Sequence, residues 1–198
     1  MNQQEGLWSG KFGSDYTERN KDHNLQSNIE LFKKVLNSDM HHVLEFGANI
    51  GQNYHAIKTI NKCTSYTGVE INKDAFKELK KIEGIQTYNQ SIFDFKVDYQ
   101  RQMVFTKGLL IHISPNDIDK AYQKIYDSAK KHIVLMEYYN PTPLEVEYRG
   151  GKDRLWKRDF CGEMLAKYKD LVLIRYGFIY HLDSNPQDDL FYFVMEKR

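Results

Sequence analysis

Apolar runs and helical patterns alternate along the chain from residue 43 onward, and this alternation constrains the fold more than any other feature. Short apolar runs separated by stretches with helical spacing are typical of a parallel sheet with crossover helices. The expected strands are Val43–Phe46, Tyr66–Glu70, Ile85–Tyr88, Met103–Thr106 and His132–Glu137. The expected helices run from the turn after the first strand to about Ile60, over Lys73–Lys81, and over Pro115–Ala129 with Ser114 as N-cap. The sequence therefore predicts an α/β fold.

The last two apolar runs predict an antiparallel end to this sheet. A segment with Pro, Gly and Arg, Asn140–Arg158, and a helix at about Phe160–Lys167 precede the runs Leu171–Tyr180 and Leu190–Glu196. The connection Asp183–Asp189 is too short to hold a crossover helix, so the two runs are expected to pair as a hairpin at one edge. We therefore predict a Rossmann-like, mostly parallel, seven-stranded sheet with an antiparallel last strand and helices on both faces.

Length and composition predict a single domain. The chain has 198 residues, of which 41% are apolar, and this is enough for one buried core. We expect residues 41–198 to form the core and residues 1–40 to form a cap segment with a helix at Asn28–Leu36. The composition of this segment favours packing on the sheet. The alternative is a lid over a ligand, in which Tyr16 and Arg19 contact that ligand.

Charge and cysteine usage disfavour several classes of partner. The 28 Lys and Arg nearly balance the 27 Asp and Glu, giving a net charge of +1, so no overall field attracts nucleic acid or an anionic membrane. Cys63 and Cys161 lie far apart without metal-ligand spacing, which favours free thiols in a reducing compartment and no metal site. We find no signal-peptide pattern and no run long enough to span a bilayer, so the cytoplasm is the expected location. The oligomeric state is not readable from the sequence.

The segment Glu45–Gly51 carries the most informative site chemistry, since it is a strand that ends in a glycine turn at the mouth of a helix. It lacks the middle glycine of GxGxxG and has an acid, Glu45, two residues before its first glycine. A carboxylate there would repel a pyrophosphate and attract the ammonium of a methionine moiety, so S-adenosylmethionine fits better than NAD. A buried acid that caps its own turn is the alternative. The expected backbone contacts to the cofactor are Gly47, Ala48, Asn49 and Gly51.

A second acid, Glu70, closes the next strand at about the spacing at which an acid meets the ribose of a bound adenosine. A carboxylate can accept hydrogen bonds from both ribose hydroxyls. The alternative is an ordinary negative charge at the start of the following helix. After the third strand, Ser91 offers a polar contact to adenine and Ile92 an apolar wall. With Ile71 beside Glu70, these residues form the expected adenosine site.

Motifs spread over nearly the whole chain carry a family resemblance. They are Leu7–Gly13 with Tyr16–Asn20, the Glu45 turn, Leu110–Ile113, Glu137–Pro143 with Tyr148–Gly150, Lys157–Phe160 and Gln187–Asp189. With them the chain resembles the class I methyltransferases, and more narrowly the methylases associated with pseudaminic acid biosynthesis. The resemblance implies a methyl-donor site and a link to nonulosonic acid or surface-glycan pathways. The chain departs from the common pattern at Asn49, where a second glycine is frequent, and at Ser91, where an acid often meets adenine.

Three residues after the fourth and fifth strands are candidates for acid–base chemistry. His112 follows the fourth strand, at the edge where the reacting groups of open α/β folds gather, and could take a proton from an acceptor. Its apolar neighbours make a packing role the alternative. Glu137 and Tyr138, at the end of the fifth strand, are the second candidates.

A basic and aromatic cluster follows the fifth strand, and we expect Tyr148, Arg149 and Arg158 to bind an anionic sugar or nucleotide-sugar acceptor. A solvated surface loop is the alternative for this cluster. Other functions stay open beside small-molecule methyl transfer. They are an NAD-dependent oxidoreductase, a nucleic-acid methyltransferase, which would usually show a stronger basic footprint, and a cofactor-binding protein without catalysis.

Overall fold

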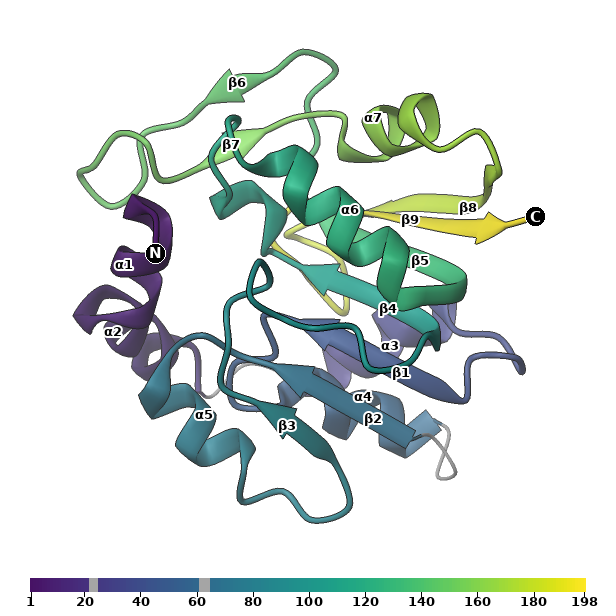
Figure 1. The fold of residues 1–198 in the computed structure, drawn as a ribbon, viewed down its shortest axis with the longest axis horizontal. Helices are drawn as coiled ribbons and strands as arrows, with labels where there is room; N and C mark the ends of the chain where they lie inside the picture. Colours follow the sequence, from purple (N-terminus) through teal and green to yellow (C-terminus); the bar gives the residue numbers. More distant parts are fainter. Residues whose placement is uncertain (22–24, 61–64) are drawn as a thin grey trace.

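The chain folds around one seven-stranded sheet in a computed structural model that describes residues 1–21, 25–60 and 65–198 (Figure 1). The sheet order is β3-β2-β1-β4-β5-β9-β8, and neighbours from β3 to β5 are parallel. β9 runs antiparallel to both β5 and β8, so the predicted hairpin closes one edge as expected. The strands are β1 (His42–Phe46), β2 (Ser65–Val69), β3 (Gln86–Tyr88), β4 (Arg101–Lys107), β5 (Ala129–Glu137), β8 (Leu171–Ile179) and β9 (Leu190–Lys197).

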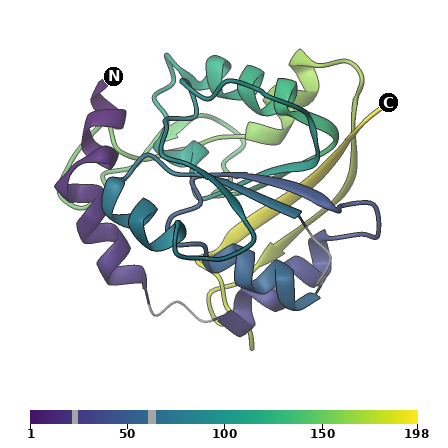
Figure 2. The same ribbon diagram turned by 60° about the horizontal axis from the view of Figure 1, so that its bottom comes forward.

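Helices cover both faces of this sheet (Figures 1 and 2). α6 (Ile118–Ser128) and α7 (Phe160–Lys167) pack on one face, and α3 (Leu25–Val35), α4 (Gln52–Ile60) and α5 (Lys73–Leu79) lie on the other. β1 shows how the alternation of side chains divides the core. Leu44 and Phe46 belong to the apolar cluster beneath α6, whereas Val43 belongs to the cluster beneath α3 and α4. The predicted Rossmann-like architecture with helices on both faces is confirmed.

The helix expected from Pro115 begins three residues later, at Ile118. The Ser114 hydroxyl accepts a hydrogen bond from the amide of Asn116, and the Ser114 carbonyl accepts one from the amide of Asp117. These bonds form a turn that contains Pro115, and Asp117 is the residue before the helix. Ser114 therefore caps a turn and not the helix, which is a correction to the sequence prediction.

The strand expected from His132 begins earlier, at Ala129, directly where α6 ends. Ala129 pairs with Arg101 at the start of β4, beyond an irregularity in the register of the two strands. Because this pairing extends the ladder toward α6, no loop separates the helix from β5.

The first two helices, α1 (Gln3–Ser9) and α2 (Lys11–Asn20), lie at the edge of the sheet toward which the parallel strands point (Figure 1). The side-chain Nδ2 of Asn72, at the start of α5, donates to the carbonyl of Trp8 in α1 and to that of Gly10, which lies between the two helices. The Thr17 hydroxyl donates to the side-chain oxygen of Asn49. We call α1 and α2 the cap. The composition of residues 1–40 predicted that this segment packs on the sheet. This prediction is correct for α3 and wrong for the cap.

The segment between β5 and α7 forms a small hairpin of β6 (Leu144–Glu145) and β7 (Trp156–Lys157), and a short 3-10 helix, η1 (Leu110–His112), follows β4. Cys161 is buried with a free thiol, and Cys63 lies outside the described residues. In the described parts of the chain, no helix is long and apolar enough to cross a membrane. The same residues contain no group of three or more His, Cys, Asp or Glu placed to hold a metal ion.

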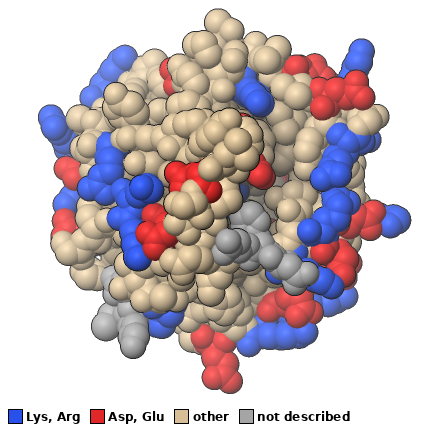
Figure 3. All heavy atoms as spheres, turned by 180° about the vertical axis from the view of Figure 1, so that it is seen from behind, with Lys and Arg blue, Asp and Glu red and all other residues tan. Residues whose placement is uncertain are grey.

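The surface charges are mixed. Figure 3 shows the face opposite to that of Figure 1, and there lysines and arginines are interspersed with aspartates and glutamates. The surface ion pairs include ones between residues one helical turn apart, such as Lys33 with Glu30 and Lys81 with Glu78. Such exposed pairs each contribute little to stability.

Candidate functional site

A cavity opens at the carboxyl ends of β1, β2 and β4, between the sheet and the cap. Its volume is about 1170 Å³ with its open mouth included. Ligands of open α/β folds bind at this edge of the sheet. The cap contributes part of the wall, namely Asn2, Gln4, Glu5, Trp8, Gly13, Tyr16 and Thr17.

The glycine turn after β1 forms one side of this cavity and is held in place by β2. The amides of Gly47 and Ala48 donate to the Val69 carbonyl at 2.9 and 3.0 Å, and the amide of Asn49 donates to Oε2 of Glu70 at 2.8 Å. Gly47 and Asn49 have φ angles of 80° and 47°, in the left-handed region that glycine adopts freely and asparagine tolerates. Gly47, Ala48 and Asn49 line the cavity.

Two of the expected cofactor contacts lie outside the cavity wall. Gly51 has a φ of 86°, and a Cβ atom at this position would overlap the side chain of Ile82. Gly51 therefore allows α4 and the segment after α5 to pack closely, and it does not face the ligand. Arg19 is exposed on α2, whereas Tyr16 of the same helix lines the cavity. Burial raises the pKa of the Tyr16 hydroxyl to about 12.

Glu45 also lies outside the wall, because its side chain points toward α4. Its carboxyl group accepts a hydrogen bond from Nδ2 of Asn53 at 2.6 Å and another from the hydroxyl of Tyr66. Burial raises the pKa of Glu45 to about 8, so the group is largely protonated at neutral pH. The direct charge contact expected from Glu45 is thus corrected. Asn53 lies between Glu45 and the cavity and lines the wall itself.

The Glu45 environment gives a first prediction. The raised pKa means that the unfolded chain loses this proton near pH 4.5 and the folded chain keeps it to about pH 8, so wild-type stability falls as pH rises through this window. Glu45→Gln removes this dependence. As pH rises through this window, we expect the free energy of unfolding of the variant to increase relative to that of wild type by up to about 1.4 kcal/mol per pH unit.

Urea unfolding of both proteins at pH 5, 6, 7 and 8 measures the difference. Other titrating groups are common to the two proteins and cancel in the comparison. Glu78→Gln, at an exposed site on α5, is the control and should follow wild type at every pH. Parallel profiles for wild type and Glu45→Gln would show that Glu45 is ionised in the folded protein.

The residues expected to contact adenosine gather on the wall beyond β2 and β3. Glu70 is 8% exposed, and its Oε1 accepts a hydrogen bond from the backbone amide of Asn72 at 2.7 Å. Burial raises the pKa of this carboxyl group. Ile71, Ser91 and Ile92 line the same region. Each oxygen of Glu70 accepts one backbone amide and has a lone pair left for a ligand.

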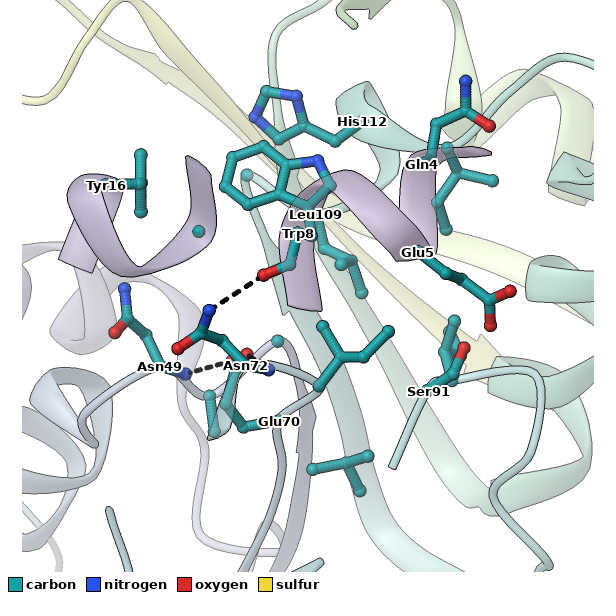
Figure 4. Close-up of a pocket in the computed structure, with 18 of the residues that line it drawn as sticks. Gln4, Glu5, Trp8, Tyr16, Asn49, Glu70, Asn72, Ser91, Leu109 and His112 are labelled. Carbon is teal, nitrogen blue, oxygen red and sulfur yellow. Dashed lines mark hydrogen bonds between the residues drawn. The ribbon is translucent and has the colours of Figure 1, made fainter. Parts of the chain in front are cut away.

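His112, in η1 after β4, lines the cavity and faces the cap (Figure 4). Its Nδ1 lies 2.7 Å from the carbonyl oxygen of Arg154. Since a carbonyl can only accept, Nδ1 carries the hydrogen and Nε2 has a free lone pair. The ring centroid of Trp8 lies 4.4 Å from that of His112. Burial lowers the pKa of His112 to about 4, so the imidazole is neutral at physiological pH.

The two other acid–base candidates lie behind the cavity wall. Glu137 is buried, with Oε1 accepting the amides of Leu109 and Leu110 at 3.1 Å each and Oε2 accepting that of Ile111 at 3.4 Å. This carboxyl group anchors η1, and burial raises its pKa to about 7. Tyr138 donates a long hydrogen bond to Asp188. Neither side chain is among the described residues that line the cavity, and a catalytic role for the two residues stays a prediction.

The expected acceptor wall after β5 is not brought together. Arg149 is exposed at the tip of the β6–β7 hairpin, where its guanidinium lies 5.9 Å from the ring of Tyr148. Nε of Arg158 is 2.8 Å from Oε1 of Glu163 on α7, and the two residues form an ion pair. Tyr148 is the one of the three next to the cavity, with its ring 5.3 Å from that of His112. The turn of the β6–β7 hairpin directs Arg149 to solvent, and Arg158 is bound in its ion pair with Glu163.

The structure adds residues to the wall that sequence reasoning missed. Lys107, the last residue of β4, is the one Lys or Arg among the described residues that line the cavity. Its signal in the sequence is a lysine at the end of a buried strand, directly before a glycine. Trp8 and Asn53 were missed as well. The conformation of the cap places Trp8 over His112, and the first turn of α4 directs Asn53 to the glycine turn.

No family model and no curated protein matches this sequence. Solved structures do match its fold. Magnesium protoporphyrin IX methyltransferase from Synechocystis PCC 6803 with bound SAM matches with a TM-score of 0.72 and 9% identity, covering 100% of this chain and 99% of that one. An S-adenosylmethionine-dependent methyltransferase from Clostridium acetobutylicum matches with a TM-score of 0.63 and 10% identity over 94% and 97% of the two chains.

A third match is 1,6-didemethyltoxoflavin-N1-methyltransferase from Burkholderia thailandensis, with bound 1,6-didemethyltoxoflavin and S-adenosylhomocysteine. Its TM-score is 0.69 at 9% identity, and the alignment covers 93% of this chain and 83% of that one. At such low identity these likenesses establish the fold alone. The chain has the Rossmann-like fold found in class I methyltransferases.

Proposed function

We propose that this protein is an S-adenosylmethionine-dependent methyltransferase that acts on a small, anionic acceptor. The observation that carries the proposal is Glu70 at the end of β2, facing a cavity beside the glycine turn that follows β1. An acid at this position suits the ribose of a bound adenosine, and the turn after β1 lacks the middle glycine of a pyrophosphate-binding GxGxxG loop. Structural neighbours crystallised with SAM or S-adenosylhomocysteine support the same cofactor.

The residues on the wall fit the cofactor part by part. Glu70 accepts the ribose hydroxyls, and Ser91 with Ile92 forms the polar and apolar sides of the adenine site. Gly47 and Ala48 bring the backbone close to the amino-acid end. When bound, S-adenosylmethionine supplies an electrophilic methyl group on a positively charged sulfur.

His112 is the proposed general base. Its Nε2 carries no proton and the residue lines the cavity, so His112 can accept the proton that an acceptor hydroxyl or amine loses during transfer. The Arg154 carbonyl fixes the orientation of the ring, and Trp8 covers it from the cap side. The cap also shields the reacting groups from water. Alignment of donor and acceptor supplies much of the rate in such a transfer.

The family resemblance of the motifs suggests a sugar or nucleotide-sugar of a nonulosonic acid or surface-glycan pathway as acceptor. Aromatic rings of Trp8, Phe12, Tyr16 and Tyr148 pack against one another beside His112 and could offer flat apolar surfaces to a sugar ring. The charge of Lys107 in the wall is compatible with a ligand that carries an anionic group. We further propose that residues 1–198 act as a single domain in this reaction.

A second prediction tests the cofactor. We expect isothermal titration to show binding of S-adenosylmethionine and of S-adenosylhomocysteine, and no binding of NAD, because the site lacks a pyrophosphate loop. Tighter binding of NAD than of S-adenosylmethionine would contradict the proposal. A donor-turnover screen over sugar nucleotides and nonulosonic acids then identifies the acceptor, and donor binding without any turnover would indicate a cofactor-binding protein without catalysis.

A further inference from the structure

Lys107 is a cation without a partner in the wall of the cavity. It is the last residue of β4, and no hydrogen bond or ion pair joins its ammonium to any residue that the structure describes. Burial lowers the pKa of this ammonium, and none of the acids around it, namely Glu45, Asp188 and Glu137, is in contact with it. An ammonium in such a partly dehydrated position calls for an anionic ligand.

Asn53 is an unpartnered acceptor in the same wall. Its Nδ2 donates to Glu45, which fixes the orientation of the amide, and its Oδ1 is buried without any hydrogen-bond partner. Buried polar atoms of this kind are rare in folded proteins unless a ligand or water completes them. We therefore expect Oδ1 of Asn53 to accept a hydrogen bond from a ligand in the cavity.

The two unpartnered groups lie on the same side of the glycine turn. β1 and β4 are neighbours, with Phe46 paired to Thr106, so the turn after β1 and Lys107 emerge side by side. Lys107 follows Phe105 by two positions and so shares the sheet face of Glu45, which pairs with Phe105. Glu45 is in turn bonded to Asn53. The wall next to the turn thus presents a cation and an orphan acceptor to one ligand.

We propose that Lys107 and Asn53 recognise the α-amino-acid end of the cofactor, with Lys107 binding the carboxylate and Oδ1 of Asn53 accepting from the ammonium. A zwitterionic headgroup satisfies both groups at once, whereas a simple anion would leave Asn53 without a donor. The inference rests on the proposed function, since it concerns the same cofactor. It assigns the selection for the intact amino-acid end to a lysine on β4 and not to Glu45, the acid of the glycine turn.

The test compares two ligands that differ in that end. S-adenosylhomocysteine carries the α-amino-acid group, and 5′-methylthioadenosine has the same adenosine and thioether without it. We expect Lys107→Met to weaken the binding of S-adenosylhomocysteine by about 10- to 100-fold, because one hydrogen bond between charged groups is lost. The affinity for 5′-methylthioadenosine should stay within about twofold of that of wild type. Lys107→Arg, which keeps the charge, should recover most of the affinity for S-adenosylhomocysteine.

Lys96→Met, at an exposed site outside the cavity, is the matched control and should bind both ligands as wild type does. If Lys107→Met weakened the binding of both ligands equally, or of neither, the assignment of Lys107 to the amino-acid end would be overturned. Failure of wild type to bind S-adenosylhomocysteine at all is a different result and would instead remove the proposed function. Binding of 5′-methylthioadenosine by Lys107→Met also shows that the variant is folded.

Discussion

Replacing Glu137 with alanine is expected to destabilise the folded protein by about 3 kcal/mol. The carboxyl group of this residue accepts hydrogen bonds from the amides of Leu109, Leu110 and Ile111, which would lose their acceptor, and the last two of these bonds are buried. Each such orphaned donor costs about 1–3 kcal/mol, and release of the buried carboxyl group offsets part of the sum. Because η1 carries His112, the loss should also disturb the cavity wall.

Urea unfolding at pH 7 measures this effect. Glu137→Gln keeps one oxygen acceptor for Leu109 and Leu110 but turns an amide donor toward Ile111. The free energy of unfolding of this variant should therefore lie between those of wild type and Glu137→Ala. Glu147→Ala removes an exposed glutamate nearby and serves as the control, with an expected change within about 0.5 kcal/mol. If Glu137→Ala cost less than about 1 kcal/mol, the three hydrogen bonds would not be what holds η1 in place.

The fold could be predicted because it follows from patterns that the chain itself carries. Buried parallel strands appear as apolar runs, and the short polar connection before β9 excludes a crossover helix. The ends of elements could not be predicted as well. The start of α6 depends on whether Ser114 caps a helix or a turn, and the start of β5 depends on its pairing with Arg101.

The site could be predicted in position and only in part in its side chains. Parallel strands end at one edge, so residues after β1, β2 and β4 had to meet there. The direction of each side chain depends on partners far away in sequence. Tyr66 and Asn53 hold Glu45 away from the cavity, and Glu163 holds Arg158. Lys107 was overlooked because a lysine at the end of a strand usually lies in solvent.

Replacing Glu70 with alanine is expected to weaken the binding of S-adenosylhomocysteine by about 2–4 kcal/mol, which is roughly 30- to 1,000-fold in the dissociation constant. The carboxylate can accept one hydrogen bond from each ribose hydroxyl, and bonds to a charged acceptor contribute about 1.5–3 kcal/mol each. It also holds the amides of Asn49 and Asn72 that shape the turn. Part of the loss would therefore come from a looser wall. Titration calorimetry measures the total.

A cycle with truncated ligands separates the two contributions. Wild type should bind adenosine more tightly than 2′-deoxyadenosine or 3′-deoxyadenosine, since each deoxy compound lacks one hydroxyl that Glu70 accepts. In Glu70→Ala this preference should vanish, whereas a looser wall alone would weaken all three ligands and leave the preference intact. Glu78→Ala removes an equal charge from the exposed side of α5 and should retain wild-type discrimination. Persistence of the preference in Glu70→Ala would place the ribose away from the end of β2, and the assignment of the adenosine site would fail with it.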